Sequence, residues 1–321
     1  MLPEVTVPSR AGRSHIRYLQ ACVDSLYCQD ETAGGAGLLH SALQQWQRAR
    51  RMLDEADYSE TAGRDLLVVA GNLAVCTGWL AFDAGNAPLA RQLLSEARLL
   101  AGSAGDTVLA THALAELSGY TSWMARMYRN GGLAGKARGS ARESLRLASQ
   151  AADEARHERS PRLHVMIALR LSNATSLLGD NAAFRSAISR ARRELDHTPG
   201  ADDPCRYRAD EKNIAHDEAL GHVNLGDAGR GEQLYRSVLD GEVPPLWRAY
   251  TGAALADSLL QQGARDDAVT EGLNALSSLE DGVKSVRSLV SLRLVRAAAQ
   301  EQGSEEFCTR FDAAERALTA V

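Results

Sequence analysis

Apolar residues recur at helical spacing along most of the chain, and glycines interrupt this pattern at regular intervals. In the stretch GWLAFDAGNAPLARQLLSEA (78–97), an apolar run stops at Gly85 and an alanine-rich run resumes after Asn86. A glycine can close a helix in the left-handed conformation, and Asn or Asp often caps the helix that follows. The stretch therefore predicts two helices joined by a short turn.

The same helix–glycine–helix unit recurs along the chain. Counting from Gly85, three steps of 47 residues reach Gly132, Gly179 and Gly226, and a step of 37 residues reaches Gly263. Five units in register predict a repeat array, in which each helical hairpin buries its apolar face against its neighbours.

Small side chains at a fixed offset after each glycine allow two helices to pack closely. Five residues after the glycine stands Ala in three copies, but Phe184 and Gly231 in the other two. The pattern resembles tetratricopeptide repeats, whose usual period is about 34 residues, and the longer period here predicts longer helices or connections. The predicted fold class is all-α, a TPR-like right-handed α-solenoid of antiparallel helix pairs.

The pattern predicts fourteen helices, and Ser160 before Pro161 is the strongest start signal among them. We expect an N-terminal arm and helix over 1–35, a TPR-like helical repeat domain over 36–321, and a possible sub-boundary in the loop 198–204. The predicted helices cover residues 14–29, 37–55, 61–84, 87–102, 107–130, 134–157, 161–178, 181–197, 205–225, 228–240, 246–262, 265–279, 283–302 and 304–319.

Composition agrees with an all-α protein and excludes several classes. The 321 residues include only 8 prolines and 5% aromatics, and the net charge of −5 lacks the basic footprint of a nucleic-acid binder. Five cysteines without a CxxC spacing argue against a disulfide framework and a zinc site. No signal peptide and no apolar stretch of about 18 residues is evident. We expect a cytoplasmic protein that binds neither nucleic acid nor membrane.

Four segments together suggest a family. They are VDSLYCQDETAGGAGLL (23–39), LDEADYSETAGRDLL (53–67), GWLAFDAG (78–85) and KSVRSLVSLRLV (284–295). The chain resembles the C-terminal, repeat-containing sensor half of actinobacterial helix-turn-helix regulators of the Xre type. The resemblance implies a sensor or interaction module. The DNA-binding domain that precedes this half in the family is expected to be absent here.

Motifs of common enzymes are missing, since GxSxG, GxxxxGK[ST], HExxH and GxGxxG do not occur. The densest polar cluster is RADEKNIAHDEALGH (208–222), whose candidate catalytic residues would be His216, Asp217, Glu218 and His222. Glu211, Glu218 and His222 share one helical stripe, but the ExxH spacing of di-iron helices is absent. A partly exposed helix face is favoured over a metal site, so we predict no metal and no cofactor.

The first helix of each unit should line the concave surface of the array, where extended ligands bind. Asn side chains recur at these positions and form a row. An Asn amide can pair with both the N–H and the C=O of a peptide backbone. The row resembles that of peptide-sensing repeat regulators. Arg side chains could hold a carboxylate, and aromatic rings could form an apolar floor. The predicted ligand-binding residues are Asn72, Trp79, Asp83, Trp123, Arg126, Asn130, Arg170, Asn173, Asn213, His216, Asn224 and Tyr250.

Three functions stay open at this point. The favoured one is a ligand-sensing or protein-interaction module of a transcriptional regulator, a possible homodimer, that binds a small molecule or short peptide in its concave groove. The second is an enzyme recruited from the regulator fold in a natural-product biosynthetic pathway. The third is a non-catalytic scaffold. The alternative for the Asn and Trp residues is that they cap helices and fill the core.

Overall fold

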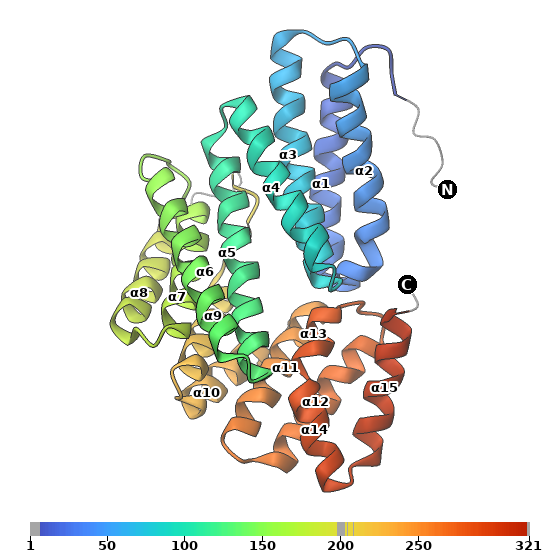
Figure 1. The fold of residues 1–321 in the computed structure, drawn as a ribbon. Helices are drawn as coiled ribbons and strands as arrows, with labels where there is room; N and C mark the ends of the chain where they lie inside the picture. Colours follow the sequence, from blue (N-terminus) through green and yellow to red (C-terminus); the bar gives the residue numbers. More distant parts are fainter. Residues whose placement is uncertain (1–6, 198–202, 204, 208, 320–321) are drawn as a thin grey trace.

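The computed structural model describes residues 7–197, 203, 205–207 and 209–319, and within these ranges it contains helices and no strand (Figure 1). The fifteen helices described are Arg13–Ala33 (α1), Gly35–Glu55 (α2), Glu60–Asp83 (α3), Ala87–Ala104 (α4), Thr107–Asn130 (α5), Ala134–Glu154 (α6), Pro161–Leu177 (α7), Asn181–Asp196 (α8), Glu211–Asn224 (α9), Ala228–Leu239 (α10), Pro245–Gln261 (α11), Arg265–Glu280 (α12), Val286–Ser291 (α13), Arg293–Gln302 (α14) and Glu305–Thr319 (α15).

The predicted glycine turns are confirmed. Each of the five marker glycines has a positive φ, from 73° at Gly132 to 90° at Gly226, and each joins the two helices of a pair. The predicted caps are also present, since the side chains of Asn86, Asp180 and Asp227 each accept a hydrogen bond from a backbone N–H in the first turn. The pairs are α3/α4, α5/α6, α7/α8, α9/α10 and α11/α12.

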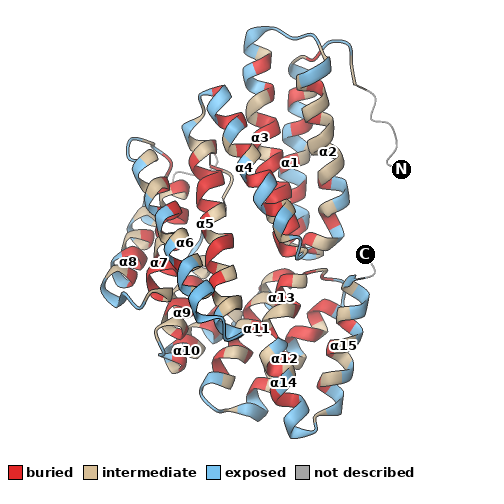
Figure 2. Cartoon of the chain, viewed as in Figure 1, coloured by how far each residue is buried: buried red, intermediate tan, exposed pale blue. Residues whose placement is uncertain are grey.

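Helices from successive pairs pack against each other in chain order. The first helices contact along the series α1, α3, α5, α7, α9 and α11, while α4, α6, α8, α10 and α12 lie outside them. Burial follows this layering, because few residues of α3, α5 and α7 are exposed, whereas the outer helices expose one face (Figure 2). The fold is the predicted TPR-like right-handed α-solenoid of antiparallel helix pairs.

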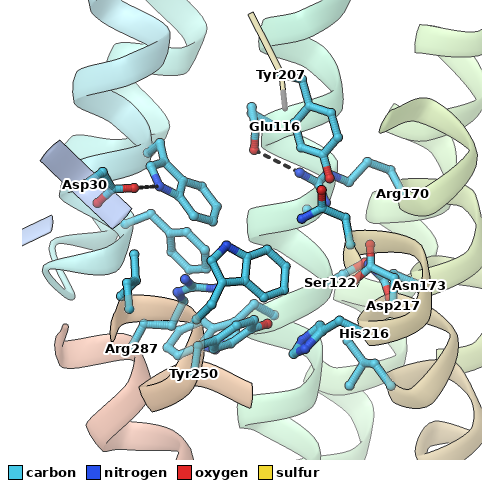
Figure 3. A pocket seen from close by; sticks show the side chains of 18 of the residues that line it. Asp30, Glu116, Ser122, Arg170, Asn173, Tyr207, His216, Asp217, Tyr250 and Arg287 are labelled. Carbon is cyan, nitrogen blue, oxygen red and sulfur yellow. Dashed lines mark hydrogen bonds and ion pairs between the residues drawn. The ribbon is translucent and has the colours of Figure 1, made fainter. Parts of the chain in front are cut away.

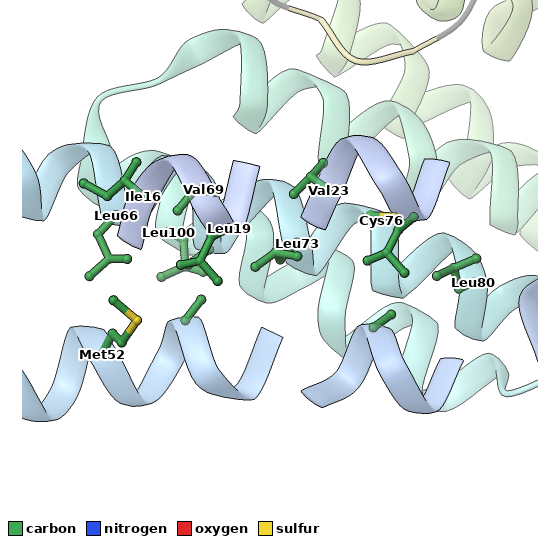
Figure 4. Packing of buried hydrophobic residues seen from close by; sticks show 14 of the residues in the cluster. Ile16, Leu19, Val23, Met52, Leu66, Val69, Leu73, Cys76, Leu80 and Leu100 are labelled. Carbon is green, nitrogen blue, oxygen red and sulfur yellow. The ribbon is translucent and has the colours of Figure 1, made fainter. Parts of the chain in front are cut away.

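The helices α1 and α2 share one apolar core with α3. Leu19 of α1, Met52 of α2 and Leu73 of α3 are almost completely buried in this cluster, which Leu100 of α4 extends (Figure 4). The α3 helix is also the one described helix that is long and apolar enough to cross a membrane, but 72% of its apolar window is buried inside the protein. Packing of a core helix accounts for that apolar character.

Each of the two positions that depart from alanine, Phe184 and Gly231, is matched in size by a different residue of α9. A Cβ at Gly221 would lie 2.0 Å from the Phe184 ring, and a Cβ at Gly231 would lie 2.4 Å from Val223. The large Phe184 of α8 therefore packs against a glycine of α9, so that the helices still approach closely.

The first and last units of the array meet, which the sequence did not predict. The α1 helix contacts α11, and α3 contacts α13. At this seam the Lys284 N–H donates to the Ala33 carbonyl at 2.7 Å, and the Ala36 N–H donates to the Lys284 carbonyl at 2.9 Å. The solenoid thus closes on itself, and its concave face encloses a space.

Two predicted helices differ most from the structure, beyond shifts of up to four residues at the ends of others. The helix predicted over 205–225 begins at Glu211, because Asp210 and Asn213 form a capping box there. The helix predicted over 283–302 is divided at Leu292, whose N–H bonds to the Leu289 carbonyl three residues back. Next to this break, the Ser291 hydroxyl donates a hydrogen bond to the backbone carbonyl of Arg287. A side-chain donor of this kind competes with the backbone N–H groups of the helix for the carbonyl.

The predicted boundary at 198–204 falls on residues outside the described ones, except for Asp203. Asp203 accepts hydrogen bonds from the Ser160 hydroxyl at 2.5 Å and from the Arg162 N–H at 3.0 Å at the start of α7. Cys205 and Tyr207 pack into the core between α5 and α7. The described part of this connection is therefore attached to the repeat array.

Candidate functional site

A cavity of about 190 Å³ lies inside the closed turn of the solenoid. It is lined by the first helix of every pair, with additional residues from α1, α13 and the segment before α9 (Figure 3). The cavity lining includes Asp30, Trp79, Phe82, His112, Glu116, Gly119, Trp123, Arg126, Arg170, Asn173, Leu177, Arg206, Tyr207, Asn213, His216, Asp217, Asn224, Trp247, Tyr250 and Arg287.

Nine of the twelve predicted ligand-binding residues line this cavity, namely Trp79, Trp123, Arg126, Arg170, Asn173, Asn213, His216, Asn224 and Tyr250. The other three lie elsewhere. Asn72 lines a separate cavity between α1, α3 and α5, Asn130 is exposed at the end of α5, and Asp83 is completely buried behind Arg287. The binding role of all twelve stays a prediction.

Aromatic side chains form much of the cavity wall. Three of the four tryptophans of the chain line it, namely Trp79, Trp123 and Trp247. The Phe82 ring meets the Trp123 ring edge to face, with centroids 5.2 Å apart. Since edge-to-face pairs hold both rings in fixed orientations, this wall is a preformed apolar surface.

Arg287 of α13 reaches into the cavity from the seam. Its guanidinium lies 3.9 Å from the centroid of the Tyr250 ring and 4.8 Å from that of Trp79. The Asp83 carboxylate accepts from Arg287 Nε at 2.9 Å, from the Ser285 hydroxyl at 2.8 Å and from the Gly35 N–H at 2.8 Å. Burial lowers the pKa of Arg287, but electrostatic interactions with Asp83, Tyr250 and Asp30 and the hydrogen bond to Asp83 raise it above the ordinary value overall.

A second buried ion pair lies on the opposite wall (Figure 3). Arg170 of α7 donates to Glu116 of α5 at 3.2 Å, and His112 Nε2 lies 3.7 Å from the same carboxylate. Burial alone would raise the pKa of Glu116, but Arg170 and His112 lower it overall, so the carboxylate is ionised. Gly119 makes room for this arrangement, because a Cβ there would lie 2.7 Å from Arg170 Nε.

Asp30 of α1 is a buried carboxyl group whose charge is sensitive to pH. It accepts from Trp79 Nε1 at 2.8 Å, and its pKa rises to about 7 because of burial and, next, the nearby Asp83 charge. The group is therefore partly protonated near neutral pH.

His216 and Asp217 are the two candidate catalytic residues that reach the cavity. His216 stacks on Tyr250 with centroids 4.6 Å apart, and its Nδ1 lies 3.1 Å from the Thr251 hydroxyl. Burial lowers the pKa of His216 to about 3, so the imidazole is neutral at pH 7. Burial raises the pKa of Asp217, although Arg170 and a hydrogen bond from Asn173 act in the opposite direction.

The remaining two catalytic candidates lie outside the cavity. Glu218 pairs with Arg192 of α8 at 2.6 Å, and His222 packs edge to face on Phe184, 3.3 Å from Asp227. Positions 218 and 222 are four residues apart and share one face of α9, whereas 216 and 217 lie on the face that lines the cavity. In the described part of the chain, no group of three or more His, Cys, Asp or Glu residues is placed to hold a metal ion.

The predicted row of asparagines is not continuous along the cavity. Asn213 is engaged in the capping box of α9, and the Asn224 amide bonds to Ser176 and Arg129. Asn72 donates to the Val68 carbonyl of its own helix. Only Asn173 among them has a buried side-chain oxygen without a hydrogen-bond partner in the described structure. Asn173 is therefore the asparagine of this row with a buried acceptor left for a ligand in the described structure, and the binding of a peptide backbone by the row stays a prediction.

Five buried polar atoms around the cavity lack a hydrogen-bond partner among the described residues. Two are donors, Trp123 Nε1 and Arg170 Nε, and three are acceptors or can act as acceptors, Asp30 Oδ1, Asn173 Oδ1 and His216 Nε2. A buried polar group without a partner costs about 1–3 kcal/mol. Their concentration at one cavity is the pattern expected of a site that bonds to a polar ligand.

Several lining residues were missed in the sequence. Glu116 lies two helical turns before Trp123 on the same stripe of α5, and Trp247 lies one turn before Tyr250. Extending the two stripes by these distances would have found both residues. Asp30 and Arg287 carried no such signal, because they belong to α1 and α13 and reach the cavity through closure of the solenoid.

The comparisons with known proteins concern fold. No family model matches the chain, and no curated protein matches its sequence. The solved structure of a Rap protein complexed with competence and sporulation factor is similar over 95% of this chain and 99% of that chain, with a TM-score of 0.48 and 11% identity. The Rap conjugation gene regulator of plasmid pLS20, solved with the Phr* peptide, is similar over 98% of each chain, with a TM-score of 0.37 and 15% identity.

Proposed function

We propose that the chain is a ligand-sensing module that encloses a small molecule, or the end of a short peptide, in the central cavity. The observation that carries the proposal is the group of five buried polar atoms without partners, which surround one aromatic-walled space. Donors and acceptors are both present, so the complementary ligand is polar at its edge and apolar on its faces. The resemblance of the sequence to sensor halves of Xre-type regulators supports a role in regulation.

The size of the cavity favours a compact ligand. One water-sized occupant needs roughly 10–15 Å³ of such space. The 190 Å³ cavity therefore accommodates on the order of a dozen non-hydrogen atoms, which is a small molecule or one to two peptide residues. A longer peptide would have to leave the cavity through an opening.

The test is mass spectrometry of small molecules released when the purified full-length chain is denatured. We expect a compound in stoichiometric amount, and we expect Leu177→Trp to abolish its retention because the indole would fill space inside the cavity. Leu99→Trp is the matched control, since Leu99 is 73% exposed on α4. The proposal fails if both variants release the same compounds as the native chain.

Enzymatic activity is a second candidate, and one observation favours it. Asp30 has a pKa of about 7 and faces an aromatic cavity, as a general acid or base often does. The discriminating experiment is incubation of the released compound with the full chain, followed by mass analysis for a product. Conversion that Asp30→Asn abolishes would support an enzyme, whereas an unchanged compound would support a sensor.

A further inference from the structure

We propose that the cavity selects an aromatic carboxylate, with its ring against Trp123 and its carboxylate at Arg126. This inference rests on the proposed ligand-sensing function and names the chemical class of the ligand. It follows from the charges around the cavity and from the two neighbouring donors on α5.

Arg126 is the cavity arginine without a counter-ion in the described structure. Arg170 pairs with Glu116, Arg287 pairs with Asp83, and Arg206 pairs with Asp24. Arg126 makes no ion pair or hydrogen bond among the described residues, although it lines the cavity between α5 and α9. A half-buried guanidinium without a partner is a binding position for an anion.

The acidic groups near Arg126 do not neutralise it through contact. Asp217 and Asp257 interact with it only through longer-range electrostatics, and burial raises the pKa of both carboxyl groups. The imidazole of His216, which also faces this part of the cavity, is neutral. No described carboxylate therefore occupies the contact position at the Arg126 guanidinium, which leaves that position to an anionic group of a ligand.

A second donor lies beside Arg126 on the same helix face. Trp123 precedes it by three residues, and side chains three apart on a helix are neighbours. The indole Nε1–H of Trp123 is buried without a partner. An N–H donor and a guanidinium at this spacing are suited to the two oxygens of one carboxylate.

A cationic aromatic ligand is disfavoured because the protein already occupies its place. The guanidinium of Arg287 lies over the rings of Trp79, Phe82 and Tyr250, where a ligand ammonium would otherwise bind. A second cation would be repelled by both Arg287 and Arg126. The Trp123 ring, which meets Phe82 edge to face and is not covered by Arg287, remains as the aromatic surface for the ligand ring.

The experiment compares three probes that share one ring and differ in charge. Calorimetric titration of the full chain with indole-3-acetate, indole-3-acetamide and tryptamine should give a Kd about tenfold or more lower for the acetate than for the amine. Arg126→Gln should weaken binding of the acetate by about tenfold and leave the acetamide unchanged. Arg126→Lys should restore part of the difference, because it keeps the charge without the planar fork.

The matched control is Arg142→Gln, at an exposed arginine of α6 that has no ion pair among the described residues. It should leave all three affinities unchanged. An aromatic carboxylate could come from the C-terminus of a peptide or from a free small acid, and the peptide Gly-Gly-Trp and its C-terminal amide distinguish these sources. Binding of Gly-Gly-Trp but not of its amide would indicate a peptide C-terminus. Binding of indole-3-acetate but of neither peptide would indicate a free acid.

Three outcomes would overturn the assignment. They are binding of tryptamine that equals or exceeds that of the acetate, failure of all probes to bind, and normal binding of the acetate by Arg126→Gln. Circular dichroism of each variant excludes misfolding as the cause of a loss. The ligand-sensing proposal is judged separately by the compound released from the native chain, so an abundant cationic or non-aromatic compound would refute the ligand class and support the sensor.

Discussion

The buried pair between Asp83 and Arg287 holds the two ends of the solenoid together, and its removal should open the seam. Asp83 is completely buried and Arg287 is 5% exposed, so neither charge is solvated. The substitution Asp83→Asn keeps the volume of the side chain and removes the charge. Arg287 would then be a buried cation without its principal counter-ion.

Removing one partner of a buried ion pair costs about 3–5 kcal/mol. The lower end applies here, because Arg287 keeps its contacts with Tyr250 and Trp79 and because Asp30 can take up part of the counter-charge. We therefore expect a loss of about 3 kcal/mol in the free energy of opening the seam, which corresponds to a roughly 150-fold larger equilibrium constant.

Hydrogen exchange measures this opening locally, which suits a repeat protein whose unfolding need not be two-state. The amides of Ala36 and Lys284, which bond across the seam, should exchange roughly 150-fold faster in Asp83→Asn where reclosing outpaces exchange. Amides in α6, away from the seam, should keep their rates. Arg287→Met in the same chain should recover most of the loss, since it removes the unpaired charge.

Asp153→Asn is the matched control, because Asp153 and its partner Arg156 are 73% and 67% exposed and such pairs contribute little. If the Ala36 and Lys284 amides of Asp83→Asn exchanged at rates within threefold of the native chain, the role assigned to this pair would be refuted.

Three further predictions concern stability and are measured by urea unfolding. The raised pKa of Asp30 means that between about pH 4 and pH 7 the folded chain holds a proton that the unfolded chain releases, so its contribution to stability is greatest below about pH 4 and is lost as pH rises to about 7. Asp30→Asn should remove up to about 4 kcal/mol of this pH-dependent change in the free energy of unfolding, and an unchanged pH dependence would contradict the assignment. Leu19→Ala should destabilise by about 3 kcal/mol because Leu19 is completely buried, whereas Leu99→Ala, at a 73% exposed position, should change stability by less than about 0.5 kcal/mol. Gly221→Ala should destabilise the chain by about 1–3 kcal/mol, because the added methyl group would overlap Phe184, and Phe184→Leu in the same chain should recover part of this loss. Gly139→Ala, at an open position of α6, should instead stabilise the chain by up to about 1 kcal/mol. Equal effects at the two glycines would contradict the packing argument.

Local chemistry along the chain was sufficient to predict the helices and their pairing. Each marker glycine supplies a conformation that other residues rarely adopt, and Asn86, Asp180 and Asp227 bond to backbone groups a few residues away. Such interactions depend on nearby residues alone. The inward stripe of each first helix follows from the same periodicity, which is why Trp123, Arg126 and His216 were placed on the concave side.

The asparagine row shows what helical periodicity leaves open. Periodicity places a side chain on a face but does not say which neighbour satisfies it. Asn213 and Asn224 are satisfied by protein groups, whereas Asn173 keeps a buried oxygen without a partner in the described structure. That difference depends on contacts between helices that are distant in sequence.

Sequence alone determined the all-α repeat, its glycine turns and the face of each helix that turns inward, because these properties arise within one helical hairpin. Tertiary structure alone decided that the array closes, and closure brings Asp30 and Arg287 from opposite ends of the chain to the same cavity. Small rotations between successive pairs add up over the whole array, so no single hairpin encodes whether its ends will meet. The position of the charges and unpartnered atoms around the cavity therefore depends on the rotations accumulated over the whole array.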